Sequence, residues 1–232
     1  MLRFLWVETG LDRADVKFSQ SPQKPFNRLK VRLKREIITF NQASADLANK
    51  GQYVSAKDWN ALIKDPDVLV LDTRNAYETA IGVFEGAVDP VLSTFTQFAN
   101  YVRKELDLSR QKKVAMYCTG GIRCEKASAF MKAEGFDEVY YLKGGILKYL
   151  EEVSPEESLW RGECYVFDKR MAVGHGLSTG SYAMCYGCGD PVTLADRDTP
   201  QFGAGVACPT CHAACSDADK AKSAPALKAD GG

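Results

Sequence analysis

Cysteines are the residues of this sequence whose type and spacing point most directly to chemistry. Cys118 lies in the stretch Tyr117-Cys-Thr-Gly-Gly-Ile-Arg-Cys-Glu-Lys126. The two glycines of this stretch allow a tight turn whose amide groups point inward, and Arg123 adds a positive charge. Such surroundings stabilise a thiolate or a persulfide, so the pattern predicts that Cys118 is a nucleophile. The alternative is a buried structural thiol.

Cys124 follows Cys118 by six residues and lies at the predicted start of a helix. In one interpretation it is a resolving cysteine that forms a disulfide with an oxidised Cys118. In the other it is an inert thiol packed against a sheet. Spacing alone leaves both interpretations open.

Two further cysteine pairs have the spacing of metal ligands. Cys185-Tyr-Gly-Cys188 and Cys208-Pro-Thr-Cys211 are separated by 19 residues. Four thiolates in two such pairs complete a tetrahedron around one zinc ion and leave no position for water. The pattern therefore predicts a structural zinc site, and the alternative is a set of redox-active or unpaired thiols.

Composition places the chain among ordinary globular proteins. Of its 232 residues, 45% are hydrophobic and 26% are charged, which excludes collagenous, low-complexity and wholly disordered chains. Its apolar runs are too short to cross a membrane, and the opening segment is too short for a secretory signal, so we expect a cytoplasmic protein. Thirty basic residues balance thirty acidic ones, yet residues 1–40 carry nine Lys or Arg against four acids.

The residues around Cys118 are predicted to form alternating helices and strands. Apolar runs at 68–71, 113–117 and 138–142 indicate buried strands, and apolar spacing of three and four residues indicates helices at 95–106 and 124–134. A further helix should begin after Ser55, and Gly135 should end the helix at 124–134. The alternation predicts a parallel sheet with helices on both faces at 52–152, with Cys118 at the carboxyl end of a strand.

The flanking segments have other patterns. Arg28-Leu-Lys-Val-Arg-Leu-Lys34 alternates strictly, which predicts a strand in the last part of a small α+β domain at 1–40. Its basic face is either a solvated strand edge or a phosphate-binding surface. Regular periodicity fades after Pro155, so we expect a cysteine-rich segment at 153–215 and a disordered tail at 216–232. The basic face comprises Arg28, Lys30, Arg32 and Lys34.

Several stretches resemble a known family. The sequence resembles a rhodanese domain in three stretches: Cys118-Thr-Gly-Gly-Ile-Arg123, Leu71-Asp-Thr-Arg74 and Gly82-Val-Phe-Glu-Gly-Ala87. A more specific resemblance, to one family of rhodanese-domain proteins, comes from three stretches. The rhodanese-domain tRNA uridine hydroxylases are similar to this sequence at residues 28–37, 118–126 and 159–170 taken together.

The resemblance implies an oxygen-dependent oxidoreductase that converts the wobble uridine of tRNA to 5-hydroxyuridine. It implies that Cys118 is catalytic and that tRNA is the partner that the basic face meets. Asp72 and Arg74 fit the acidic and basic pair that ends a rhodanese strand, and of a functional and a structural role we expect the structural one, in which they hold the neighbouring loop by hydrogen bonds. It also implies a ferredoxin-like N-terminal domain, of which this chain is expected to retain only the last part, up to Ile38, and a zinc-ribbon-like C-terminal segment. The anion loop would consist of Thr119, Gly120, Gly121, Ile122 and Arg123.

Two other functions stay open at this stage. One is a sulfurtransferase that acts through a Cys118 persulfide, and the other is a non-catalytic tRNA-binding module. Molecular oxygen would be the hydroxylase's co-substrate. The sequence contains no haem, flavin or nicotinamide motif, and its two histidines cannot supply an iron site of two histidines and one carboxylate. No feature indicates a membrane or a protein partner.

Overall fold

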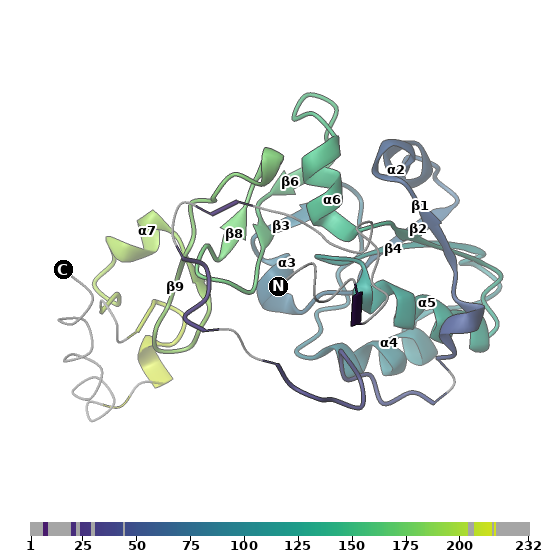
Figure 1. Cartoon of the computed structure of the whole chain (residues 1–232), viewed down its shortest axis with the longest axis horizontal. Coiled ribbons are helices and arrows are strands. Elements are labelled where there is room, and N and C mark those ends of the chain that lie inside the picture. Colours follow the sequence, from purple (N-terminus) through teal and green to yellow (C-terminus); the bar gives the residue numbers. More distant parts are fainter. Residues whose placement is uncertain are drawn as a thin grey trace.

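A four-stranded parallel sheet lies in the right-hand part of the molecule in Figure 1. The computed structural model describes residues 7–8, 20–21, 24–28, 31–43, 45–203, 207–214 and 216. The strands are hydrogen-bonded in the order β1-β5-β4-β2, and every pairing is parallel. Their bounds are Gln52–Val54 for β1, Val68–Asp72 for β2, Lys113–Tyr117 for β4 and Glu138–Leu142 for β5.

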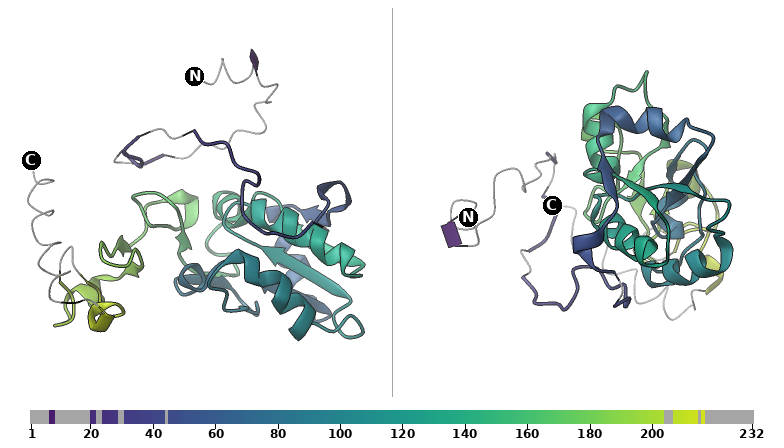
Figure 2. Two further views of the ribbon diagram at one scale, coloured as in Figure 1. Left: turned by 90° about the horizontal axis from the view of Figure 1, so that it is seen from below. Right: turned by 90° about the vertical axis from the view of Figure 1, so that its right-hand side faces the viewer.

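Helices cover both faces of this sheet, as Figures 1 and 2 show. Alternate side chains of β4 pack on opposite faces of the sheet. Val114 and Met116 lie in one apolar cluster, and Ala115 and Tyr117 lie in the other. The first cluster contains side chains of α4 and α5, and the second contains those of α2 and α6. The predicted two-faced parallel sheet is confirmed. The helix bounds are Ala56–Ile63 for α2, Ala76–Thr79 for α3, Phe98–Glu105 for α4, Ile122–Ala133 for α5 and Gly145–Glu152 for α6.

Local sequence signals explain where these helices begin and end. The Ser55 hydroxyl oxygen accepts a hydrogen bond from the Asp58 amide at 3.3 Å, which caps α2. Gly135 follows α5 with a φ of 101°, a conformation that favours glycine. Both predicted helix boundaries are confirmed.

Short antiparallel pairs follow the central sheet. β3 pairs with β6, β7 pairs with β8, and β9 pairs with β10. The bounds are Gly82–Phe84 for β3, Trp160–Gly162 for β6, Cys164–Tyr165 for β7, Ala172–Val173 for β8, Ala183–Met184 for β9 and Pro191–Val192 for β10. The short helix α7 spans Leu194–Arg197, and single 3₁₀ turns occur at Leu47–Asn49, Phe95–Gln97, His175–Leu177 and His212–Ala214.

The N-terminal region departs from the sequence-based prediction. Residues 31–34 form no strand, and Val31 and Leu33 are both exposed. The predicted strand is therefore wrong for these residues, because no described strand pairs with them and an unpaired strand cannot bury an apolar face. Lys30 and the predicted tail from 217 onward lie outside the described residues. The segment first joins the core at Phe40, whose ring stacks on Phe95 with centroids 4.6 Å apart.

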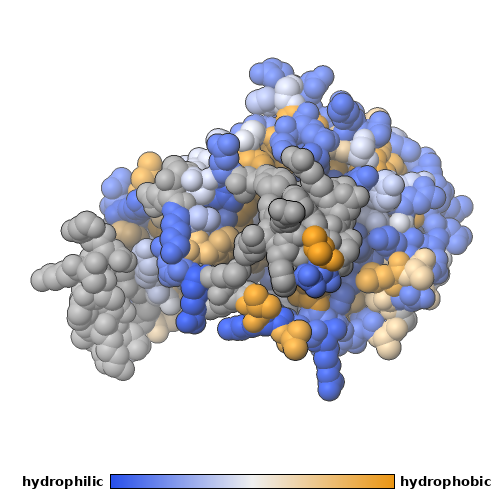
Figure 3. Space-filling view, viewed as in Figure 1, coloured by the Kyte–Doolittle hydropathy of each residue, from blue (hydrophilic) through white to orange (hydrophobic). Residues whose placement is uncertain are grey.

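The face of the molecule shown in Figure 3 is mainly polar, as expected when the apolar side chains are buried against the sheet. Apolar side chains are scattered over this face. Among the helices of the described residues, none is long and apolar enough to cross a bilayer.

Candidate active site and metal centre

Cys118 lies where β4 ends and turns into α5, at the carboxyl end of the parallel sheet. The Gly121 amide donates a hydrogen bond to the Cys118 sulfur at 3.1 Å. Gly121 has a φ of 92°, in the left-handed region, which allows the loop to curl back on the sulfur before α5 begins. Of the predicted anion loop, the Gly121 amide contacts the Cys118 sulfur, and the role of the loop as an anion site stays a prediction.

Helix α6 fixes the other side of this loop. The Ile146 amide donates to the Cys118 carbonyl at 3.0 Å, and the Leu147 amide donates to the Thr119 carbonyl at 3.1 Å. A Cβ atom at Gly145 would clash with both of these carbonyl oxygens. Glycine at this position thus permits the close approach of α6 that holds the loop.

The environment of Cys118 favours the thiolate. Burial alone would raise the pKa of this thiol. Hydrogen bonds from the Cys124 thiol and from the Cys124 and Gly121 amides, together with the charge of Arg123, instead lower its pKa to about 5. These surroundings favour the thiolate form of Cys118, the form in which a cysteine sulfur can act as a nucleophile.

The environment of Cys124 favours its protonated thiol. Both residues are buried free cysteines. Burial and the neighbouring Cys118 thiolate hold the pKa of Cys124 well above its usual value, so this thiol donates rather than accepts. The Thr73 hydroxyl lies 3.5 Å from the Cys124 sulfur and donates to the Tyr117 carbonyl at 3.0 Å.

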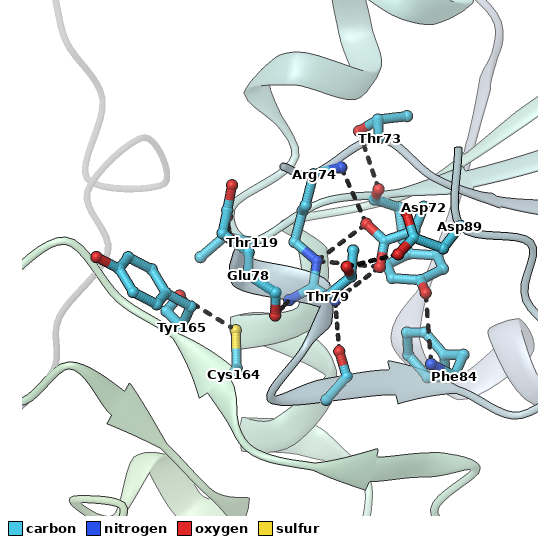
Figure 4. Close-up of polar contacts among 12 residues, drawn as sticks. Asp72, Thr73, Arg74, Glu78, Thr79, Phe84, Asp89, Thr119, Cys164 and Tyr165 are labelled. Carbon is cyan, nitrogen blue, oxygen red and sulfur yellow. Dashed lines mark hydrogen bonds and ion pairs between the residues drawn. The ribbon is translucent and has the colours of Figure 1, made fainter. Parts of the chain in front are cut away.

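A buried ion pair supports the loop from α3. The Glu78 carboxylate accepts hydrogen bonds from the Arg123 guanidinium at 2.5 and 2.7 Å and from the Thr119 hydroxyl at 3.0 Å. The side chains of Glu78 and Arg123 are 0% and 7% exposed, so water does not screen the pair. Arg123 lowers the pKa of Glu78 against the effect of burial, which raises it. Glu78 and Thr119 are both labelled in Figure 4.

A second buried ion pair has a structural role. The Arg74 guanidinium donates to the Asp72 carboxylate at 2.6 to 3.1 Å and to the Glu78 and Gly82 carbonyls at 3.1 and 2.5 Å (Figure 4). Arg74 thus ties the end of β2 to α3 and β3. This is the loop-holding role expected for the pair.

The four cysteines of the two paired motifs converge on one point. Their sulfurs all lie within 4.8 Å of one another, and Cys185 to Cys211 and Cys188 to Cys208 are 3.8 and 3.7 Å apart. Four thiolates about 2.3 Å from a tetrahedral zinc ion would be spaced by about 3.8 Å. These distances fit a metal ion better than a disulfide, whose sulfurs are about 2.05 Å apart. The cluster could therefore hold one metal ion.

Comparison with known proteins places the chain in a family. Residues 55–152 match the model of the rhodanese-like domain. A tRNA uridine(34) hydroxylase of Rhizobium etli is 53% identical over 222 residues, which cover 95% of this chain and 72% of that protein. This chain belongs to the tRNA uridine(34) hydroxylase family.

Other relatives agree with this membership. A tRNA uridine(34) hydroxylase of Picosynechococcus is 51% identical, over 91% of this chain and 71% of that protein. Among solved structures, a rhodanese-related protein of Thermoplasma volcanium aligns with 45% of this chain and 95% of its own, at 24% identity and a TM-score of 0.36. The sequence identities to the two hydroxylases confirm the resemblance inferred from the sequence.

The basic side chains predicted to share one face of a strand do not lie on a strand in this structure. Arg28, Arg32 and Lys34 are exposed in non-strand backbone, and Lys30 lies outside the described residues. Sequence reasoning also missed Glu78. Its only signal is the pattern Asn75-x-x-Glu78, which is typical of a capping box and does form one at the start of α3. That pattern indicates a helix start and says nothing about Arg123.

Proposed function

We propose that this chain hydroxylates the uridine at position 34 of tRNA, giving 5-hydroxyuridine with molecular oxygen as co-substrate, and that Cys118 is the essential residue. The observation that carries the proposal is a buried Cys118 thiolate in the loop of a chain that belongs to this family. A tRNA substrate also argues for the cytoplasm as its place of action.

The residues around Cys118 divide the work in this proposal. The Gly121 amide and the Arg123 charge hold the sulfur as an anion, so it can attack an electrophile or carry an added oxygen or sulfur atom. Glu78 holds the Arg123 guanidinium in place. If Cys118 is oxidised to a sulfenic acid, the Cys124 thiol can displace hydroxide, which leaves as water, and form a disulfide. The burial of both free thiols at the turn from β4 into α5, and the effect of each thiol on the pKa of the other, support this resolving role.

Nucleoside mass spectrometry tests the proposal directly. A strain that lacks this gene is complemented with the wild type or with Cys118→Ser, and its tRNA is digested to nucleosides. We expect the wild type, but not the variant, to restore 5-hydroxyuridine. Full restoration by Cys118→Ser would refute the catalytic role and would favour a non-catalytic tRNA-binding module.

A sulfurtransferase is the second candidate, and the loop geometry favours it specifically. A persulfide on Cys118 would extend its outer sulfur into the turn whose amide already contacts the thiolate. In the same experiment, loss of 2-thiouridine with 5-hydroxyuridine retained would support this candidate over the hydroxylase.

We also propose that the cluster of Cys185, Cys188, Cys208 and Cys211 binds a structural zinc ion. Four protein ligands would leave no open position for catalysis, and the sulfur spacing supports a tetrahedral site. The part of the cysteine-rich segment around these four residues would depend on that ion, because the apolar cluster near the metal buries few side chains. The tRNA contact of Arg28, Lys30, Arg32 and Lys34 likewise remains a proposal, which the exposure of the three described side chains supports.

A further inference from the structure

Two segments far apart in the sequence lie side by side on the surface. The Lys169 amide, in the turn between β7 and β8, donates to the Pro25 carbonyl at 3.2 Å, and the Arg170 guanidinium donates to the Gln20 carbonyl at 2.9 Å. In Figures 1 and 2 the purple N-terminal stretch accordingly runs beside the green β7–β8 region. The described residues 24–28 and the turn at 167–170 therefore form one surface.

Each of the two segments exposes a phenylalanine on this surface. Phe167 is 61% exposed and Phe26 is 57% exposed, although exposing a large apolar ring to water is unfavourable. The Phe167 ring packs against Tyr165 with centroids 5.2 Å apart, and Tyr165 packs against Tyr77 at 5.1 Å. Tyr77 directly precedes Glu78, which binds Arg123 of the Cys118 loop. A series of ring contacts thus leads from the exposed turn to the candidate active site.

Positive charges accompany the exposed rings. Lys24, Arg28 and Lys169 are exposed, and among the ion pairs of the described residues none involves them. The one acid of the turn, Asp168, is already neutralised by two-pronged hydrogen bonds from Arg170 at 2.7 to 3.2 Å. The surface therefore presents rings and unopposed positive charge together. We name Lys24, Phe26, Arg28, Phe167 and Lys169 the aromatic–basic surface.

We propose that the aromatic–basic surface binds unpaired bases of the tRNA anticodon loop, next to the uridine that enters the candidate active site. A base would stack on the Phe167 ring and Lys169 would meet a phosphate. This inference rests on the proposed function, because it needs tRNA as substrate. Exposed aromatic rings interleaved with positive charge are the combination that binds single-stranded nucleic acid, whereas lysine is depleted in protein–protein interfaces.

RNA binding to the full chain tests the inference. We expect Phe167→Leu, which keeps an apolar side chain but removes the ring, to weaken binding of an anticodon stem-loop RNA by about tenfold. Phe167→Trp should bind at least as well as the wild type. Lys169→Gln should lower the slope of log affinity against log salt by roughly one unit or slightly less, whereas Phe167→Leu should leave the slope unchanged.

Tyr53→Leu is the matched control, since Tyr53 on β1 is 59% exposed and lies in a different part of the fold. Its RNA affinity should equal that of the wild type. If Phe167→Leu also binds like the wild type, or if Lys169→Gln keeps the wild-type slope, the aromatic–basic surface does not bind RNA as proposed. Unchanged alkylation of Cys118 in both variants would show that their loop is intact.

Single abasic nucleotides in the anticodon loop identify the stacked base. At one position, removal of the base and the Phe167→Leu change should cost no more together than either costs alone, because both remove the same contact. Full additivity at every loop position would refute base stacking. RNA binding and hydroxylation by the wild type are measured first, because they distinguish failure of the proposed function from failure of this inference. If the wild type neither binds nor hydroxylates the RNA, the proposed function is refuted. If it does both but the variants behave like the wild type, only this inference is refuted.

Discussion

The ion pair between Glu78 and Arg123 makes a prediction that can be worked out from the structure. Glu78→Gln preserves the shape of the side chain but removes its charge. It also replaces one of the two carboxylate oxygens that accept from Arg123 with an NH2 group, which can only donate hydrogen bonds. The pair is buried, with side-chain exposures of 0% and 7%, so the guanidinium would lose its charged partner in a place that water does not reach.

The expected loss of stability is large for one substitution. Removing one partner of a buried ion pair costs about 3 to 5 kcal/mol. Because glutamine retains one acceptor for Arg123, we expect the lower end, about 3 kcal/mol. For a urea m-value of about 1 to 3 kcal/mol per molar, this loss moves the unfolding midpoint by roughly 1 to 3 M.

Urea unfolding followed by tryptophan fluorescence measures this shift, because Trp59 and Trp160 are both buried in the sheet core. Glu134→Gln is the matched control. Glu134 accepts similar paired hydrogen bonds from Arg103 at 2.7 and 3.0 Å, but those side chains are 25% and 45% exposed. Exposed pairs contribute little, so this variant should unfold near the wild-type midpoint. Equal midpoints for the Glu78 and Glu134 variants would refute the reasoning.

The pH dependence gives an independent check on the same pair. Arg123 lowers the pKa of Glu78 below its ordinary value of 4.5. The stabilisation from a lowered carboxyl pKa is fully present above the ordinary value and is lost as the pH falls through the lowered one. The stability difference between wild type and Glu78→Gln should therefore be constant at neutral pH and shrink only below pH 4.5. A double variant, Glu78→Gln with Arg123→Met, should recover part of the loss, because it removes the guanidinium that the single variant leaves without its carboxylate.

Three further predictions follow from the other sites. The thiolate absorbance of the wild type minus that of Cys118→Ser should titrate with a midpoint near pH 5, and the stability advantage of the wild type should grow as the pH rises from about 5 toward 9. A midpoint near 9 would remove the thiolate from the site. Elemental analysis of protein purified without chelator should find about one zinc per chain, and Cys188→Ser should lose both the metal and the order of the cysteine-rich segment. Metal-free wild-type protein with four titratable thiols would contradict this. Lys30→Gln with Arg32→Gln should lower the salt slope of tRNA binding by up to about two units without changing the reaction of Cys118 with thiosulfate, and an unchanged slope would exclude these two side chains from the tRNA contact.

The parts of the fold that could be predicted are those governed by neighbours in sequence. The strand at 113–117, the glycine turn and the start of α5 are encoded within about 20 consecutive residues, so the place of Cys118 follows from local pattern. The four metal-ligand candidates were predictable for the same reason, since each pair forms its own turn. The sequence could also indicate that Asp72 and Arg74 hold a loop, because they are two residues apart.

The parts that escaped prediction depend on distant partners. Glu78 and Arg123 are 45 residues apart, and only the folded sheet brings α3 against the loop after β4. The alternation at 28–34 has the period of a strand, yet strand formation requires a neighbouring strand that periodicity does not supply. The contact between Pro25 and the β7–β8 turn likewise joins segments with no common sequence signal.

The close approach of α6 to the Cys118 loop has a consequence for how this site can change. The carbonyls of Cys118 and Thr119 are occupied by α6 amides, which leaves the opposite, amide-bearing side of the loop turned toward the sulfur. Charge stabilisation by these amides comes from main-chain N–H groups, which every residue type except proline possesses. Ile122, which is exposed, can therefore vary without cost to the reactive anion. Substitutions at Ile122 can therefore change what the loop binds while the reactivity of the Cys118 thiolate stays the same.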